Sequence, residues 1–188
     1  TAENAWYVRA FASAPAGLLS RVAQVSVAIE NPSVFVHRFP LDLALPQSEL
    51  NDHVNWEMSQ YVDAINPREY VYDLRPLTAE RDRAGVAEVL AISVERTTLF
   101  AVQSALGGLG LDLNLVDTSF FAAEQALFQA YPEHRSARVG LVELTRNRVD
   151  VGMFVHGKLV EYECLVSPAP PGSMAAVSAR LRKLEIPE

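Results

Sequence analysis

Two adjoining stretches decide the fold of this chain: residues 49–62, ELNDHVNWEMSQYV, and residues 70–77, YVYDLRPL. In the first stretch apolar residues recur every three or four positions, which predicts a helix from Pro46 to Val62 with one buried stripe; the stripe is Leu50, Val54, Met58 and Tyr61. In the second stretch the side chains alternate between two faces, which predicts a strand. The proline of Asn66-Pro67 ends the helical segment between them, because the residue before proline avoids helical geometry.

Working outward, strands are expected on both sides of the helix. Apolar residues at 25–29 and at 34–39 predict two strands, and the short link 30–33 predicts that they form a hairpin. After the helix, strands are expected at about 69–78 and 86–94. The unit therefore reads strand, strand, helix, strand, strand.

Two more helices and a strand are expected next. The segment 96–109 predicts a helix that ends at three glycines, and residues 113–116 predict a strand. Asp117, Thr118 and Ser119 can each cap the helix that follows, which runs to about Ala130. The expected buried residues of the two helices are Leu99, Val102, Leu106 and Leu109 in the first, and Phe120, Ala123, Leu127 and Ala130 in the second.

The last third of the chain changes to the two-residue period of strands. Residues 139–144, 148–155 and 158–166 predict a meander whose turns lie at Thr145-Arg146-Asn147 and at His156-Gly157. Three further elements are expected nearer the ends of the chain: a strand at 5–12, a short helix at 15–23 and a helix at 173–184.

Composition limits the function classes. The 188 residues are 49% hydrophobic and 21% charged, which is typical of one globular domain or two small ones. The net charge of −7 disfavours nucleic acid as a partner, because an acidic surface repels phosphate. The only cysteine, Cys164, cannot form an internal disulfide, which fits a reducing compartment. No apolar run approaches the roughly 18 residues of a membrane helix.

The usual chemical motifs are not found in the sequence. Gly107-Gly108-Leu109-Gly110 follows a helix and precedes a strand, whereas a dinucleotide fingerprint needs the opposite order, so we expect a helix-ending turn. The four histidines show no ligand spacing, and no metal site is expected. No serine lies in a nucleophile signature, so we expect no catalytic residue.

Trp56 is the residue of the first helix that stands out. It lies on the side of the helix next to the buried stripe of Leu50, Val54, Met58 and Tyr61. Such an aromatic residue is either the edge of the core or a partner contact. The first interpretation is favoured, and the second makes Trp56 and Tyr61 candidate partner-binding residues.

Several short strings occur in a set order: Val25–Ile29 with Pro32, Glu49-Leu50 with Trp56–Tyr61, Val89–Val94, Val116-Asp117, and Val142-Glu143-Leu144 with 149–159. In this order they resemble the type IV pilus assembly proteins of the PilM family. That family consists of actin-like ATPase relatives similar in fold to the cell-division protein FtsA. The resemblance covers roughly residues 6 to 165.

The resemblance implies an α/β (α+β) fold: a partial actin-like, ribonuclease H-like body with an inserted sheet-plus-helix subdomain. It assigns residues 1–24 and 95–135 to the first actin-like domain, 25–94 to the insertion, and 136–188 to the start of the second actin-like domain. The first phosphate-binding hairpin of that fold would lie before residue 1. We therefore expect an N-terminally incomplete piece of a longer protein.

The second phosphate-binding hairpin departs from the family pattern. Its usual Asp and Gly are replaced by Glu143 and Thr145, the only candidate nucleotide-binding residues here. A Cβ at a turn that lies against phosphate obstructs close approach. No cofactor is expected, and ATP with magnesium only in a longer parent protein.

The resemblance thus implies a cytoplasmic scaffold of a type IV pilus, competence or secretion-type assembly, at the inner-membrane face and without ATP turnover. Its partner would be the cytoplasmic tail of a PilN-like inner-membrane protein, bound in a groove around the inserted helix, with homo-oligomers as a further option. The alternative is an ATP-binding or ATP-hydrolysing member of the actin and sugar-kinase fold. A third option is an unrelated α/β module, which would lack a crossover between 113–116 and 139–155.

Overall fold

The structure, a computed structural model, describes residues 13, 24–29, 34–61, 66, 69–77, 85–145 and 148–166. The elements expected at 5–12, 15–23 and 173–184 lie outside these residues. The order of the described elements is β1 (Gln24–Ile29), β2 (Val34–Asp42), α3 (Gln47–Tyr61), β3 (Tyr70–Pro76), β4 (Val86–Glu95), α4 (Arg96–Gly107), β5 (Asp112–Thr118), α5 (Ser119–Ala130), the 3-10 helix η3 (Pro132–Ser136), β6 (Arg138–Leu144), β7 (Arg148–Val155) and β8 (Lys158–Val166).

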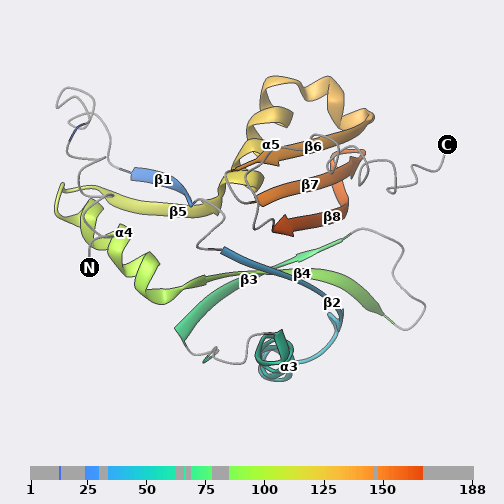
Figure 1. Cartoon of the computed structure of the whole chain (residues 1–188), viewed down its shortest axis with the longest axis horizontal. Coiled ribbons are helices and arrows are strands. Elements are labelled where there is room, and N and C mark those ends of the chain that lie inside the picture. Colours follow the sequence, from blue (N-terminus) through green and yellow to red (C-terminus); the bar gives the residue numbers. More distant parts are fainter. Residues whose placement is uncertain are drawn as a thin grey trace.

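The described strands form three sheets, with strand orders β1-β5, β2-β4-β3 and β6-β7-β8. Figure 1 shows α3 against one face of β2-β4-β3, while β1-β5 and β6-β7-β8 lie on its other side. The middle sheet is antiparallel throughout, with β4 paired to β2 on one side and to β3 on the other. Both of its faces are therefore covered, but by different parts of the chain.

The face toward α3 holds a small core of its own. The predicted stripe residues Leu50, Val54 and Met58 are buried there. They pack against alternate residues of the sheet, namely Phe39, Leu41, Val89 and Ala91, with Tyr70, Tyr72 and Leu74 at the margin. Because side chains alternate along a strand, the intervening residues of β3 point away from α3.

The predicted hairpin of residues 25–29 and 34–39 is wrong. β1 pairs in parallel with β5, and β2 pairs with β4 in a different sheet. A parallel partner must come from beyond a long crossover, and here it lies more than eighty positions along the chain. The short link between β1 and β2 instead carries the chain from one sheet to the next.

Helix α4 ends where its glycines predict, but one expected core residue is exposed. The helix stops at Gly107, and Gly110 adopts a φ of 71° in the turn that follows. Leu109 lies in this turn and is 37% exposed, whereas Leu111 is buried beside Val102 and Leu106. The predicted stripe failed at Leu109 because the helical period ends two residues before it.

Helix α5 begins at the expected cap and crosses from β5 to the last sheet. The Thr118 hydroxyl accepts a hydrogen bond from the backbone N–H of Phe121 at 3.2 Å. The residues that this helix buries are Phe120, Phe121, Glu124 and Phe128. The predicted stripe included Ala123 and Ala130, which are exposed. The helix is rotated so that its phenylalanines, which remove more apolar surface from water than alanine, face the core.

The predicted meander is confirmed as β6-β7-β8. His156 and Gly157 turn the chain between β7 and β8 with φ values of 51° and 70°. Phe154, Leu159 and Tyr162 of this sheet join Phe120 and Phe128 of α5 in the largest core cluster. The α5 ring of Phe120 lies directly over Gly152, where a Cβ would come within 2.6 Å of it.

Candidate functional site

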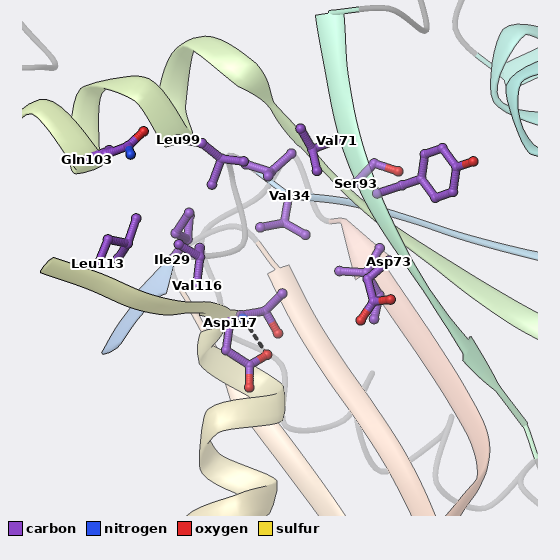
Figure 2. A pocket seen from close by; sticks show the side chains of 14 residues that line it. Ile29, Val34, Val71, Asp73, Ser93, Leu99, Gln103, Leu113, Val116 and Asp117 are labelled. Carbon is purple, nitrogen blue, oxygen red and sulfur yellow. Dashed lines mark hydrogen bonds between the residues drawn. The ribbon is translucent and has the colours of Figure 1, made fainter. Parts of the chain in front are cut away.

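A pocket of about 400 Å³ lies between β2-β4-β3 and the unit of β1, β5 and α4. Figure 2 shows side chains of all these elements converging on it. The lining residues are Ile29, Val34, Val71, Tyr72, Asp73, Ile92, Ser93, Val94, Leu99, Gln103, Leu113, Val116, Asp117 and Thr118. None of them belongs to α3, so the pocket is on the face of the sheet opposite that helix.

The strand period explains which side chains reach the pocket. In β3, Tyr70, Tyr72 and Leu74 pack on the α3 side, so Val71 and Asp73 face the other way. Val71 lines the cavity together with Leu99 of α4 and Val116 of β5. Most of the wall is therefore aliphatic, which is typical of sites that bind apolar groups.

One side of the pocket is acidic. Asp73 and Asp117 both lie on the lower side of the cavity in Figure 2, below Val71 and Leu99. Asp117 accepts hydrogen bonds at 2.8 Å from the backbone N–H of Thr118 and at 2.8 Å from the amide of Gln125. Burial raises the pKa of the Asp117 carboxyl, and the charge of Asp73 adds to the effect, against the Thr118 hydrogen bond and Arg75.

Arg75, two residues after Asp73 on the same face, is held elsewhere. Its two terminal nitrogens donate to the two carboxylate oxygens of Glu124 at 2.6 Å each. The guanidinium also lies 4.6 Å from the centre of the Phe121 ring. Glu124 is 6% exposed, so this bidentate pair is a largely desolvated link between β3 and α5.

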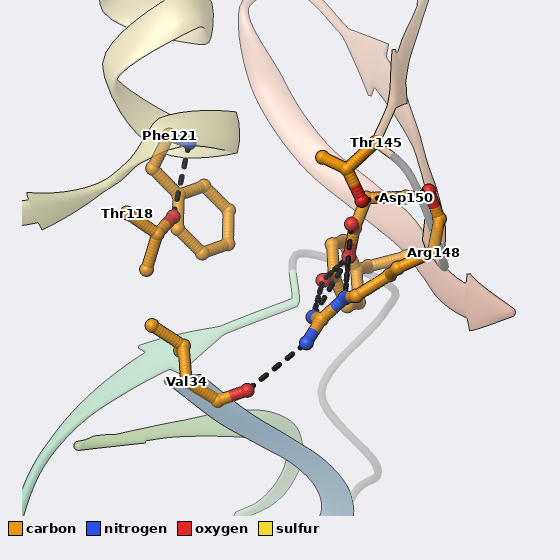
Figure 3. A network of polar contacts seen from close by, with 7 residues as sticks. Val34, Thr118, Phe121, Thr145, Arg148 and Asp150 are labelled. Atoms are coloured by element: carbon orange, nitrogen blue, oxygen red, sulfur yellow. Dashed lines mark hydrogen bonds and ion pairs between the residues drawn. The ribbon is translucent and has the colours of Figure 1, made fainter. Parts of the chain in front are cut away.

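A second polar network lies deeper, between β7 and β2 (Figure 3). Nε of Arg148 donates to both oxygens of Asp150 at 2.9 Å, and its Nη2 donates to the Tyr162 hydroxyl at 3.0 Å. Tyr162 in turn donates to Asp150. Burial raises the pKa of Tyr162, and its bond to Asp150 adds to this. Burial opposes the Arg148 charge, but the bonds to Asp150 raise the Arg148 pKa overall.

The candidate nucleotide residues lie at this network and not at the pocket. Glu143 is half-buried in β6, opposite Asp150 in the register. Thr145 closes the turn on itself, since both its backbone N–H and its hydroxyl donate to the carbonyl oxygen of Arg148, at 2.9 and 3.1 Å. Whether either residue binds a nucleotide remains a prediction.

The candidate partner residues lie on the other side of the sheet. Trp56 is 59% exposed, and its ring meets His53 edge-on at 6.2 Å. The favoured interpretation of Trp56 as the edge of the core is therefore wrong. For Tyr61 the structure describes the backbone at the end of α3 but not the side chain. Trp56 does not line the pocket.

Sequence reasoning missed the two pocket carboxylates as a site. In the sequence, Asp117 stands out only as a possible helix cap, and Asp73 only as one residue of the strand predicted from residues 70–77. One signal was present: Asp73 shares a face with the apolar residue Val71. The partner surface across the cavity could not be found in the same way, because it depends on how α4 and β5 pack.

No protein-family model matches the chain, and no curated protein matches it in sequence. Solved structures do match. One is a PilM-PilN type IV pilus biogenesis complex, with a TM-score of 0.64 and 21% identity, covering 93% of this chain and 54% of that one. Another is a Bacteroides thetaiotaomicron VPI-5482 protein with "actin-like ATPase fold and unknown function", with a TM-score of 0.53 and 9% identity, covering 97% and 62%.

The fold is actin-like and resembles that of PilM. This confirms the predicted fold class and argues against a module of different topology, since α5 supplies the expected crossover from β5 to the last sheet. At these identities the likeness establishes the fold alone. The chain spans about half to three fifths of the length of the two solved chains, 54% and 62%.

The described residues lack two further features. No helix among them is long and apolar enough to cross a membrane. No three of their His, Cys, Asp or Glu side chains gather in a way that could hold a metal ion. The expectation that the protein binds no metal stays a prediction.

Proposed function

We propose that this chain is part of a cytoplasmic actin-like scaffold of a type IV pilus, competence or secretion-type assembly, at the inner-membrane face. Its role there is to dock the cytoplasmic tail of a PilN-like inner-membrane protein. The observation that carries the proposal is the apolar pocket between β3, β4, α4 and β5. A solved structure with the same fold is described as a PilM-PilN complex, which supports this class of partner.

The shape of the pocket suits an extended segment. Its volume of about 400 Å³ accepts a few side chains and not a folded domain. β3 lies at the end of its sheet, so among the described strands only β4 pairs with it. An extended tail along the edge of β3 that no described strand occupies would form backbone hydrogen bonds and place alternate side chains in the cavity.

We also propose that this chain does not turn over ATP. The hairpin at Thr145 carries a side chain where the family has glycine, and that side chain is tied to Arg148. Titration of labelled ATP with magnesium tests the proposal. No saturable binding below millimolar ATP is expected, and micromolar binding lost in a Thr145 variant would favour the ATPase alternative.

The docking site is tested by filling the pocket from its rim. Gln103 is exposed on α4 and lines the pocket, so Gln103→Trp places an indole in the cavity without disturbing the core. Ser104 is the next residue, is also exposed and does not line the pocket, so Ser104→Trp is the matched control. The probe is a synthetic peptide of the source organism's PilN-like cytoplasmic tail, measured by fluorescence anisotropy.

We expect the peptide to bind the unaltered protein and the Ser104→Trp variant with equal affinity. It should bind Gln103→Trp at least tenfold more weakly, because the indole competes for the apolar space. Equal affinity for all three proteins would move the tail away from this pocket. No binding to any of them would reject tail docking by this chain.

A further inference from the structure

The pocket is chemically uneven, and this carries more information than its volume. Apolar side chains of β1, β2, α4 and β5 form most of its wall, while two carboxylates, Asp73 and Asp117, stand on one side. The lining residues include no lysine, arginine or histidine. A segment that filled the pocket with apolar groups alone would leave these carboxylates with a reduced hydration shell and no compensating charge.

Among the described residues, Arg75 is the cation that acts on Asp117, and it does not neutralise the pair. Arg75 is close enough to lower the pKa of Asp117, but both of its terminal nitrogens are bonded to Glu124. Asp73 accepts one hydrogen bond, from the backbone N–H of Leu74 at 2.9 Å. Asp117 accepts two, from Thr118 and Gln125, and neither donor carries a charge. The acidic side therefore keeps an excess of negative charge that a ligand can complement.

A basic group is what a membrane-anchored tail would bring. Segments on the cytoplasmic side of a membrane span carry an excess of lysine and arginine close to the span. The chain itself has a net charge of −7, so its field attracts such a segment over a distance. The charge of the pocket and the charge expected of the tail are thus complementary.

We propose that the pocket selects an extended tail segment in which a lysine or arginine adjoins apolar residues, with the cation between Asp73 and Asp117 and the apolar side chains between β4, α4 and β5. This inference rests on the proposed function and deepens it. The apolar contacts supply most of the affinity, while the charge pair fixes the direction and register of the segment. Arginine is favoured over lysine, because its planar fork can donate to two carboxylates at once.

The test uses the same tail peptide at low and at high salt. The protein variants are Asp73→Asn, Asp117→Asn and the double variant, and the matched control is Asp112→Asn. Asp112 is an exposed carboxylate on β5 that does not line the pocket. A second peptide, with its basic residues replaced by glutamine, tests the charge from the ligand side on the unaltered protein, so that this arm requires no altered protein to fold.

Each asparagine variant is expected to bind the tail about tenfold more weakly at low salt, and Asp112→Asn to bind it unchanged. The glutamine peptide should bind the unaltered protein about as weakly as the native tail binds the asparagine variants. It should also bind the unaltered protein and Asp73→Asn with the same affinity. High salt should shrink all these differences, because exposed charge pairs are screened.

Two results would overturn the inference while leaving the proposed function in place, and a third would overturn both. If the affinity of the double variant for the native tail is within twofold of that of the unaltered protein, the carboxylates do not bind a cation of the tail. The proposal of tail docking would still hold. If the glutamine peptide binds as well as the native one, the tail carries no selected basic residue. A tail that does not bind the unaltered protein at all rejects the proposed function and this inference together.

Discussion

Arg148 and Val34 lie 114 positions apart in the chain, yet Nη1 of Arg148 donates a hydrogen bond to the carbonyl oxygen of Val34 at 2.9 Å. Arg148 is the first residue of β7 and Val34 the first residue of β2, so this bond joins the last sheet to the middle one. Val34 also lines the pocket. The network of Arg148, Asp150 and Tyr162 therefore positions one wall of the proposed docking site.

The first prediction is that Arg148→Ala is strongly destabilising. Asp150 is fully buried, and the substitution removes the cation that balances it as well as the bond to Val34. Removal of one partner of a buried pair costs about 3–5 kcal/mol in the free energy of unfolding. Urea denaturation followed by circular dichroism measures the change.

The control for this variant is Arg138→Ala, at an exposed position in β6, which should change the free energy of unfolding by less than about 0.5 kcal/mol. If Arg148→Ala lost no more stability than Arg138→Ala, the buried network would not hold the two sheets together.

The second prediction concerns the contact between β7 and α5. A Cβ at position 152 would lie 2.6 Å from the ring of Phe120 and 3.1 Å from Leu159, both of them buried. Neither neighbour can move freely in a packed core, so Gly152→Ala should cost about 1–3 kcal/mol through overpacking. Thermal unfolding gives the measurement.

Gly140 offers a matched comparison in the neighbouring strand. A Cβ there meets nothing within 4 Å, so Gly140→Ala should be neutral or slightly stabilising, because alanine has less conformational freedom to lose on folding. Equal melting temperatures for the two alanine variants would contradict the close contact of Phe120 with Gly152.

Some parts of the fold could be predicted from the sequence and others could not. Helix α3 and strands β3, β4 and β6 to β8 follow from local periodicity, because one buried face per element leaves a clear pattern. The pairing of β1 was predicted wrongly, since its partner β5 is distant in the chain. The stripe of α5 also failed, because alanine is compatible with either face whereas the phenylalanines decided the rotation.

The candidate site was less predictable for the same reason. The pocket is lined by residues of β3, α4 and β5, among other elements. No local sequence pattern predicts that Asp73 and Asp117 line one cavity. Trp56 did carry a local signal, its place beside the apolar stripe, but that signal could not separate an exposed residue from one at the edge of the core. Resemblance to a family supplied the long-range order that periodicity lacks.

The third prediction is a pH dependence of stability that arises from His37. Burial lowers the pKa of this side chain, although the nearby carboxylate of Glu57 acts to raise it. The unfolded chain therefore binds a proton more readily than the folded one between the folded pKa and the ordinary value of 6.5. The contribution of neutral His37 to the free energy of unfolding should be fully present above pH 6.5. It should be lost as the pH is lowered through this window.

Urea denaturation at a series of pH values, with His37→Gln as the comparison, isolates this contribution. The difference in unfolding free energy between the two proteins should change in favour of the glutamine variant as the pH falls. His134→Gln, at an exposed position in η3, is the control. A difference that does not vary with pH would mean that His37 titrates alike in both states.

The last prediction separates the pocket from α3 as the place where a tail binds. Trp56 is exposed on α3, on the face of the sheet away from the pocket. Trp56→Ala should therefore cost less than about 1 kcal/mol in stability and should leave the affinity for the tail peptide unchanged. Tyr61→Ala, at the end of the same helix, tests the other residue predicted as a partner contact.

Comparison with Gln103→Trp distinguishes binding in the pocket from binding along α3, because the two sites lie on opposite faces of one sheet. If the tail occupies the pocket, only Gln103→Trp weakens binding. If Trp56→Ala weakens binding tenfold while Gln103→Trp does not, the tail lies along α3, and an exposed aromatic anchor would then explain the affinity. A loss in both variants would indicate a segment long enough to pass the edge of β3 and contact both faces.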